Sequence, residues 1–175
     1  MTATPIPRTL YLSLMGARDM SIINTPPKQR LPIITEILEF DDRRVKQAIE
    51  FELARHWQVY FVHNRVESIE RVYDHLKSIL PNVVFGVAHG QMESHSLERV
   101  MSQFIDGKID CLISTNIIES GLDIPNVNTI LINRADTFGL ADLYQLRGRG
   151  GRYKTARQAY AYFLVPRNWV LTQDA

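Results

Sequence analysis

The segment Gln145–Thr155, QLRGRGGRYKT, combines three arginines, one lysine and three glycines. Cationic side chains on a glycine-rich backbone are typical of phosphate binding. Within this segment, Gly148–Thr155 differs from the phosphate-loop pattern G-x-x-x-x-G-K-[ST] only by Tyr153 in place of the second glycine. Tyrosine resists the positive φ required there, and the segment follows a predicted helix and precedes a predicted strand. The sequence therefore argues against a phosphate loop at this place.

Arg149 and Arg152 lie three residues apart, on or just after a predicted helix. Two arginines in this arrangement can reach one γ-phosphate from outside and offset the charge that develops in the transition state of phosphoryl transfer. No Asp-Glu pair closes a predicted strand to hold Mg²⁺ and a catalytic water. We therefore expect these arginines to act on a nucleotide that another domain holds, and we expect the chain alone to be inactive as an ATPase.

The elements that position these arginines alternate along the chain. Short β-branched or aromatic runs alternate with segments of helical period, which predicts an α/β fold with a mostly parallel sheet flanked by helices. Asn64 and Glu67 resemble a capping box, and an apolar stripe at helical spacing follows and ends before Pro81. The predicted strands are residues 58–63, 83–89, 109–115, 127–133 and 159–165, and the stripe is Val66, Ile69, Tyr73, Leu76 and Leu80.

The first forty residues follow a looser pattern. Residues 8–16 and 30–40 are predicted strands separated by the turn-rich NTPPKQ, and residues 41–57 are a predicted helix with an acidic start. We interpret residues 1–40 as a linker or an edge extension, and the abrupt start TATPIPRT indicates a fragment of a longer chain.

Polar loops follow three of the predicted strands. Ligands of open parallel sheets bind at the carboxyl ends of the strands, and helix starts with free N–H groups favour anions there. The three loops therefore predict one phosphate-binding rim, although each loop alone is equally consistent with an ordinary cap or turn. The loops are His63-Asn64-Arg65, His89-Gly90-Gln91 and Thr115-Asn116.

Composition excludes several other classes of protein. The net charge is +1, from 20 basic and 19 acidic side chains, so any attraction to nucleic acid must be local. Residues 143–173 contain no Asp or Glu but several arginines, which predicts a basic face. The single cysteine, Cys111, is consistent with a cytoplasmic location, and the sequence contains neither a signal peptide nor a run long enough to span a membrane. His89 and His95 lack the further ligands of a zinc site, so we expect no metal.

The chain resembles superfamily-two helicases in three motifs. Gln145–Arg152, QLRGRGGR, resembles the sixth motif, Q-x-x-G-R-x-x-R; Thr115–Asp123, TNIIESGLD, resembles the fifth; and Thr2-Ala3-Thr4 resembles the third. Four segments in this order and spacing are more specific, because they resemble the bacterial transcription-repair coupling factor family, with the RecG-type branch-migration helicases as its nearest relatives. These segments are TATPIPRTL, AHGQM, STNIIESGLDIPN and RADTFGLADLYQLRGR.

This resemblance implies the second RecA-like domain of a double-stranded DNA translocase at residues 41–175, preceded at 1–40 by the tail of the first helicase domain and a linker. The first domain would bind most of ATP and Mg²⁺, and the parent would displace stalled RNA polymerase and recruit excision-repair proteins through domains absent here. By position, Arg149 and Arg152 would contact the γ-phosphate. The residues on the nucleotide side of the cleft between the domains would be Gly121, Asp123 and Gly148. The residues that couple the state of the nucleotide to the DNA contacts would be Thr2, Ala3, Thr4 and Gln145. The residues along the DNA backbone would be Asn64, Arg65, His89, Gly90, Thr115 and Asn116.

Gly150 departs from the family pattern, which has valine at this position. Glycine there adds backbone freedom between the two proposed fingers, at a cost of about 0.5–1 kcal/mol in a helix interior. Two alternatives stay open at this stage: a RecG-type helicase domain, and a non-enzymatic nucleotide or nucleic-acid binding module that shares the fold.

Overall fold

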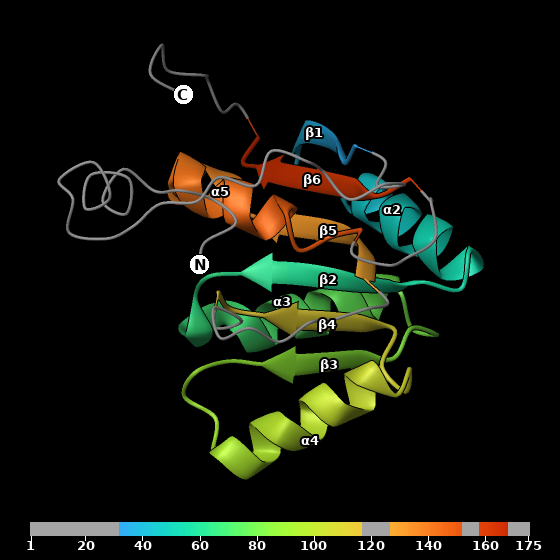
Figure 1. Cartoon of the computed structure of the whole chain (residues 1–175), viewed down its shortest axis with the longest axis vertical. Coiled ribbons are helices and arrows are strands. Elements are labelled where there is room, and N and C mark those ends of the chain that lie inside the picture. Colours follow the sequence, from blue (N-terminus) through green and yellow to red (C-terminus); the bar gives the residue numbers. More distant parts are fainter. Residues whose placement is uncertain (1–31, 117–126, 152–157, 168–175) are drawn as a thin grey trace, which may run out of the picture.

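The computed structural model of the chain describes residues 32–116, 127–151 and 158–167, drawn in colour in Figure 1. These residues form strands β1 (Ile34–Glu39), β2 (Gln58–His63), β3 (Phe85–Ala88), β4 (Cys111–Ser114), β5 (Val127–Asn133) and β6 (Tyr160–Val165). The helices are α2 (Asp42–Ala54), α3 (Val66–Ile79), α4 (Ser94–Ile105) and α5 (Leu140–Arg147), with a short 3₁₀ turn, η1 (Ala135–Thr137), before α5.

The strands of the described residues form one sheet in the order β1-β6-β5-β2-β4-β3. Every pairing is parallel, so all carboxyl ends lie along one edge of the sheet. The predicted strands at 58–63 and 127–133 are confirmed at both ends, and those at 83–89, 109–115 and 159–165 are confirmed with shorter bounds. The expected open α/β fold with a parallel sheet is therefore confirmed.

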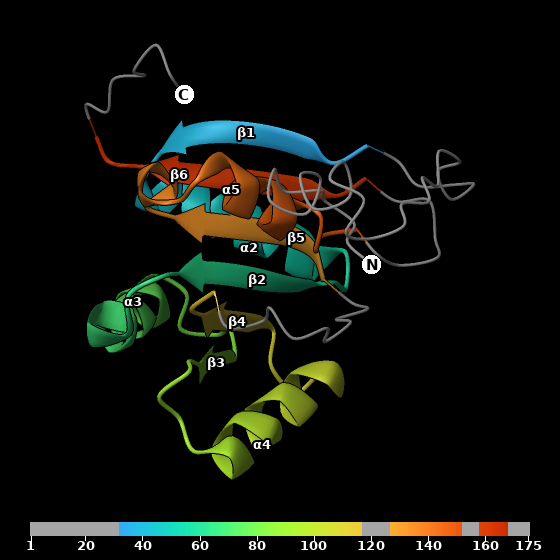
Figure 2. The same cartoon turned by 60° about the vertical axis from the view of Figure 1, so that its left-hand side comes forward.

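The central strands are buried on both faces, because crossover connections place helices on each side of a parallel sheet. All six residues of β2 are buried, and so are the four of β4. On one face, α2 and α3 supply Ile49 and Leu76 to the core, together with Phe61 from β2. On the other face, α4 and α5 supply Phe104 and Leu146 (Figure 2).

The predicted start of α3 is wrong in one detail. The helix begins at Val66 with Arg65 as its N-cap residue, and no described side chain caps it. The backbone N–H of Arg65 donates to the carbonyl oxygen of His63 over 2.9 Å, which leaves Asn64 outside the helix. The Asn64 amide oxygen instead accepts from the backbone N–H of Asn116 at 3.5 Å. Asn64 and Glu67 therefore form no capping box, although the apolar stripe is confirmed where Ile69, Leu76 and Leu80 are buried.

The edge strand β1 comes from the first forty residues of the chain. It pairs with β6 from Ile34 to Glu39 and is exposed over most of its length. The predicted strand at 30–40 therefore exists and extends the edge of the sheet. Whether the chain divides into domains at residue 40 stays a proposal.

A buried carboxylate attaches α2 to the sheet. Glu52 is 0% exposed, and its carboxylate accepts from Thr129 Oγ1 at 2.6 Å and from Asn128 Nδ2 at 3.2 Å. Arg55 adds an ion pair at 3.3 Å, and its guanidinium lies 5.2 Å from the centre of the Phe51 ring. Removing one partner of a buried charge costs about 3–5 kcal/mol. This network therefore fixes α2 against β5 at the amino edge of the sheet.

Helices α2 and α4 end in the same hydrogen-bonded motif. After α2, Trp57 N–H donates to Glu52 and His56 N–H donates to Leu53; after α4, the N–H groups of Lys108 and Gly107 donate to Gln103 and Phe104. This pair of bonds is the Schellman motif, in which the residue after the C-cap has a positive φ. Gly107 has φ +74° and carries no β-carbon. His56 has φ 62°, and in this left-handed conformation its β-carbon lies too close to the following carbonyl oxygen.

We expect His56→Gly to stabilise the fold. Glycine removes the left-handed strain, so the free energy of unfolding should rise by about 0.5–1 kcal/mol after the entropy lost by glycine on folding is subtracted. Urea denaturation monitored by circular dichroism measures this change. Gly107→Ala is the matched control, because it introduces the same strain at the end of α4 and should destabilise by a similar amount. A loss of stability in His56→Gly would contradict the argument.

Candidate nucleic-acid interface

Four neighbouring strands end at the same level and bring their polar loops together. The register pairs Ala88 with Ser114, Val62 with Ser114 and His63 with Asn133, so β3, β4, β2 and β5 end side by side. We call the residues at and directly after these four ends the strand-end rim. It contains the predicted His89 and Gly90, Thr115 and Asn116, and Asn64 and Arg65, together with Asn133, Arg134 and Asp136, which the sequence analysis did not single out.

Asn64, Arg65 and Gly90 are exposed at the rim, and Asn116 is half-buried. Asn64 and Asn116 connect two of the loops through the hydrogen bond described above. The structure thus brings the six predicted DNA-contacting residues to one edge of the sheet. Side chains and backbone donors of this kind suit phosphate oxygens, which accept hydrogen bonds without providing information on base sequence.

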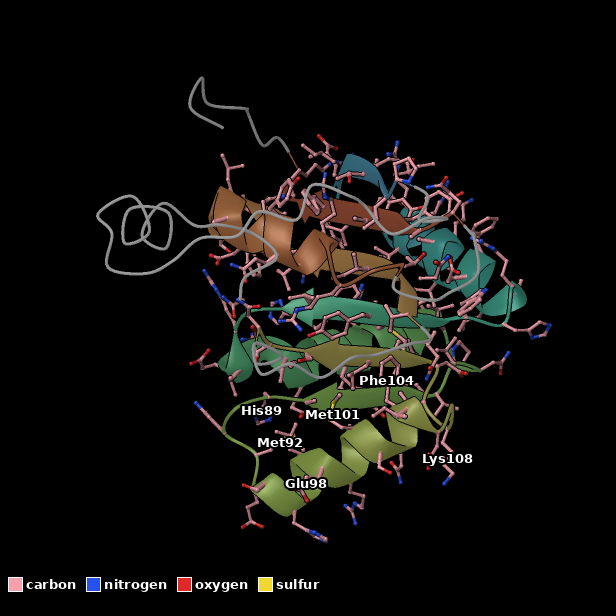
Figure 3. All side chains as sticks on the ribbon, in the orientation of Figure 1. His89, Met92, Glu98, Met101, Phe104 and Lys108 are labelled. Carbon is pink, nitrogen blue, oxygen red and sulfur yellow. The ribbon has the colours of Figure 1, made fainter. Side chains whose placement is uncertain are left out.

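Two buried polar atoms at the rim have no hydrogen-bond partner among the described residues. They are Thr115 Oγ1, in a residue that is 5% exposed, and His89 Nδ1. His89 lies at the end of β3, where its N–H points to Met92 Sδ at 3.4 Å and its carbonyl accepts from Met92 N–H (Figure 3). Because an unpaired buried polar group costs about 1–3 kcal/mol, these two atoms favour a ligand at this edge.

His63 joins the ends of β2 and β5. Its Nδ1 accepts from Asn133 Nδ2 at 3.1 Å, so Nε2 carries the proton and donates to Ser68 Oγ at 2.8 Å. Burial lowers the pKa of His63 below its usual value, and the positive charges of Arg65 and Arg134 lower it further. The imidazole is therefore held neutral and fixes the loop that carries Asn64 and Arg65.

Arg134 and Asp136 form a pair after the end of β5. Arg134 Nε lies 3.0 Å from Asp136 Oδ1, and Nη2 lies 2.9 Å from Oδ2. These hydrogen bonds are the first cause of the lowered pKa of Asp136, and the charge of Arg65 contributes to it. Arg134 has φ 56° and ψ 49°, a left-handed conformation that is uncommon for arginine. The visible signal in the sequence was an arginine directly after an apolar strand, with an acidic residue two positions later.

The backbone of Arg149 follows the end of α5 that is remote from the carboxyl edge of the sheet. Helix α5 starts after η1 near the carboxyl edge and runs back over the sheet, so that Gly151 N–H donates to Val127 O at the start of β5 (Figure 1). Burial raises the pKa of Tyr60 to about 12, while its bond to Ser114 and the charge of Arg149 lower it. Arg149 is thus half-buried close to the face that Tyr60 lines. Gln145 is half-buried on α5, and Gly148 is its C-cap.

The two glycines after Arg149 differ in what they tolerate. A β-carbon on Gly150 would lie 3.7 Å from the carbonyl oxygen of Arg147 and 4.0 Å from Ile130 Cγ2, which are ordinary contacts. A β-carbon on Gly151 would approach Ala159 Cβ to 2.7 Å, and Gly151 has φ +68°. A β-carbon therefore fits at Gly150, whereas at Gly151 it would meet both the Ala159 methyl group and a backbone that favours glycine.

Several predicted site residues lie outside the described residues: Thr2, Ala3, Thr4, Gly121, Asp123 and Arg152. Within the described ranges, no group of three or more His, Cys, Asp or Glu side chains could hold a metal ion. No helix of those ranges is long and apolar enough to cross a membrane.

Residues 42–154 match the helicase conserved C-terminal domain family. All 175 residues align with the transcription-repair-coupling factor of Myxococcus xanthus at 55% identity and with that of Bacillus subtilis (strain 168) at 53% identity. The chain spans 14% and 15% of the length of these relatives. This similarity confirms the resemblance that the motifs indicated.

The structure of RecG bound to a three-way DNA junction superposes on this chain with a TM-score of 0.78 and 33% sequence identity. The match covers 99% of this chain and 23% of the RecG chain. The Mycobacterium smegmatis helicase Lhr, bound to single-stranded DNA and AMP-PNP, covers 94% of the chain and 23% of its own length at a TM-score of 0.69. Lhr shares 17% identity and supports the fold alone. The expected RecA-like fold of a helicase C-terminal domain is confirmed.

We expect the stabilising effect of His63 to depend on pH. The unfolded imidazole has a pKa of about 6.5, and the folded pKa is lower. Below about pH 6.5 the unfolded state therefore binds more protons than the folded state, so stability falls as the pH falls toward the folded pKa. The comparison is the free energy of unfolding of the wild type and of His63→Gln at pH 7.5 and pH 5.5. The wild type should be the more stable at pH 7.5, and the difference should narrow at pH 5.5; an unchanged difference would contradict this role of His63.

Proposed function

The chain belongs to the helicase conserved C-terminal domain family, and from this premise we propose that it is the second RecA-like motor domain of an ATP-dependent double-stranded DNA translocase of the transcription-repair coupling type. The observation that carries the proposal is the placement of two chemistries on one domain. Polar groups that suit phosphate gather along the strand-end rim, and Arg149 follows the far end of α5. A motor domain requires both a DNA contact and a nucleotide contact.

The rim supplies the DNA contact in this proposal. Asn64, Arg65, His89, Gly90, Thr115 and Asn116 bind the backbone of the duplex. Contacts to phosphate suit a translocase because they do not depend on base sequence. The unpaired Thr115 hydroxyl supports this assignment, since a hydroxyl can donate to a phosphate oxygen.

The arginines supply the nucleotide contact. Arg149 and Arg152 reach the γ-phosphate of an ATP·Mg²⁺ that the first RecA-like domain of the same parent chain mainly holds. Their positive charge stabilises the transition state of hydrolysis. Of this pair, Arg149 lies in the described residues, where it is half-buried two residues after the end of α5.

The remaining predicted residues complete the nucleotide side of the proposal. Gly121, Asp123 and Gly148 face the nucleotide, while Gln145 and the segment Thr2-Ala3-Thr4 couple the state of the nucleotide to the DNA contacts. On this proposal the chain alone does not hydrolyse ATP.

The parent activity follows from the relatives at 50–55% identity, which bear the name transcription-repair-coupling factor. We propose that the parent displaces stalled RNA polymerase and recruits excision-repair proteins through other domains. A RecG-type branch-migration helicase is the second candidate, because RecG shares 33% identity over nearly the whole chain. The higher identity favours the coupling factor, and a preference of the parent for branched DNA over linear duplex would favour the RecG type.

The proposed role of Arg149 can be tested in a protein that joins this chain to its preceding RecA-like domain. Arg149→Ala should lower the kcat of DNA-stimulated ATP hydrolysis by about 10³-fold, the lower end of the effect of an arginine finger. Arg99, which is exposed on α4, is the matched control, and Arg99→Ala should leave kcat unchanged. Unaltered hydrolysis by Arg149→Ala would exclude the finger role, and hydrolysis by the 175-residue chain alone would exclude the division of labour between the domains.

Gly150→Val tests the backbone between the two arginines. Valine restricts this backbone, and the first atom of its side chain meets only ordinary contacts. We expect the ATPase rate of the joined protein to rise. Gly151→Ala is the control in the opposite direction, because its β-carbon would collide with Ala159. An unchanged rate in Gly150→Val would mean that Gly150 does not limit the finger geometry.

A further inference from the structure

We propose that Arg134 is a further phosphate-binding residue of the strand-end rim, preorganised by Asp136, and that it extends the DNA contact from three strand ends to four. This inference rests on the proposed function, since it concerns the same contact with the DNA backbone. It assigns a role to a residue that lies outside the third, fifth and sixth helicase motifs, although it begins the family-like segment RADTFGLADLYQLRGR.

The orientation of Arg134 supports the proposal. The Asp136 side chain is 13% exposed, whereas the Arg134 side chain is 43% exposed. Asp136 therefore holds the guanidinium from the protein side through Nε and Nη2. No described residue accepts a hydrogen bond from Nη1, and Arg134 thus presents a fixed donor group outward. Arginine held in this way suits phosphate, because its planar fork donates in a defined direction.

The backbone of Arg134 supports the proposal independently. The left-handed conformation at φ 56° is unfavourable for a residue with a β-carbon, and glycine or asparagine would relieve it. Strained residues of this kind persist where the surrounding structure fixes them, and they cluster at functional sites. Thr137 Oγ1 donates to the Arg134 carbonyl at 2.8 Å, and Thr137 N–H donates to it at 2.9 Å, so the turn is fixed by its own hydrogen bonds.

The rim, with Arg134 included, is long enough to meet several phosphates of a DNA backbone. Strand ends in a sheet are about 4.8 Å apart, so the ends of β3, β4, β2 and β5 extend over about 14 Å. Phosphates of one DNA strand rise about 3.4 Å each along the helix axis. Arg65 lies close enough to act on the pKa of both His63 and Asp136. Arg65 and Arg134 are thus adjacent cations that can contact neighbouring phosphates.

The test is the binding of the 175-residue chain to a fluorescent 20-base-pair duplex, measured by anisotropy at several salt concentrations. Arg134→Gly removes the charge and suits the left-handed backbone, so it should fold. It should weaken binding about tenfold at low salt and reduce the slope of log K against log salt by about 1. Arg134→Lys keeps the charge without the fork and should lose affinity with an unchanged slope.

Lys108 provides the matched control. Its pair with Asp106, at 3.2 Å, also joins a cation and a carboxylate two residues apart, and its side chain is 68% exposed. Lys108 lies at the end of α4 opposite His89 and Met92, away from the rim (Figure 3). Lys108→Ala should leave both the affinity and the salt slope unchanged, and an equal effect of both variants would show that only net charge matters and would overturn the proposal.

The phosphate that Arg134 binds could belong to DNA or to the nucleotide, and NMR separates these sources. The Nε–Hε signal of Arg134 reports on the atoms beside Asp136, and it should shift when duplex DNA is added but not when ATP is added. A shift with ATP alone would overturn the assignment to DNA. Wild-type binding that Arg134→Gly leaves intact would overturn this inference only, whereas a wild type that does not bind duplex at low salt would overturn the proposed DNA contact of the whole rim.

Discussion

Parallel pairing of all the strands in the described ranges is the constraint on which the rest of this domain depends. Each parallel connection returns through a crossover, and the helices cover both faces of the sheet with apolar side chains. Polar groups with partners or ligands are consequently placed at the two edges. At the amino edge Glu52 closes a network with Thr129 and Asn128. At the carboxyl edge Thr115 Oγ1 and His89 Nδ1 have no hydrogen-bond partner among the described residues, and Asn64, Arg65 and Gly90 are exposed, which makes this edge the one suited to a ligand.

Helix α5 connects the two proposed contacts as a rigid spacer. It begins a few residues after Arg134 and ends two residues before Arg149. Eight helical residues rise about 12 Å, and Leu143 and Leu146 hold the helix against the sheet. The helix therefore sets a fixed spacing between η1, which follows the rim residue Arg134, and the backbone before Arg149. In the proposed motor domain, this fixed spacing is a physical route by which the DNA contact and the nucleotide contact would influence one another.

The sequence predicted the strands and the grouping of the loops because period-2 and period-3.6 patterns follow directly from burial. It failed at Asn64, where a capping box requires a side chain to compete with the neighbouring strand end, and Asn116 N–H provided the alternative partner. It also failed to single out Arg134, because a left-handed backbone and an ion pair with Asp136 depend on the turn geometry after β5. The difference between Gly150 and Gly151 was equally hidden, since it depends on Ala159 from a distant strand.

The weak charge of the rim is consistent with stepping rather than with static binding. Around His63 the rim has two arginines and one aspartate, and its other predicted contacts are neutral donors or backbone groups. The salt-dependent part of DNA affinity grows with the number of phosphates neutralised by cations, so a rim with few cations binds with few counterions released. The proposed translocase has to release and rebind the DNA backbone in every cycle. In such a domain, neutral hydrogen bonds position the phosphates, and the small charge keeps the free energy of dissociation low. Preorganisation by Asp136 fits this requirement. The fixed guanidinium of Arg134 donates hydrogen bonds in a defined direction, and the carboxylate of Asp136 reduces the net charge of the rim.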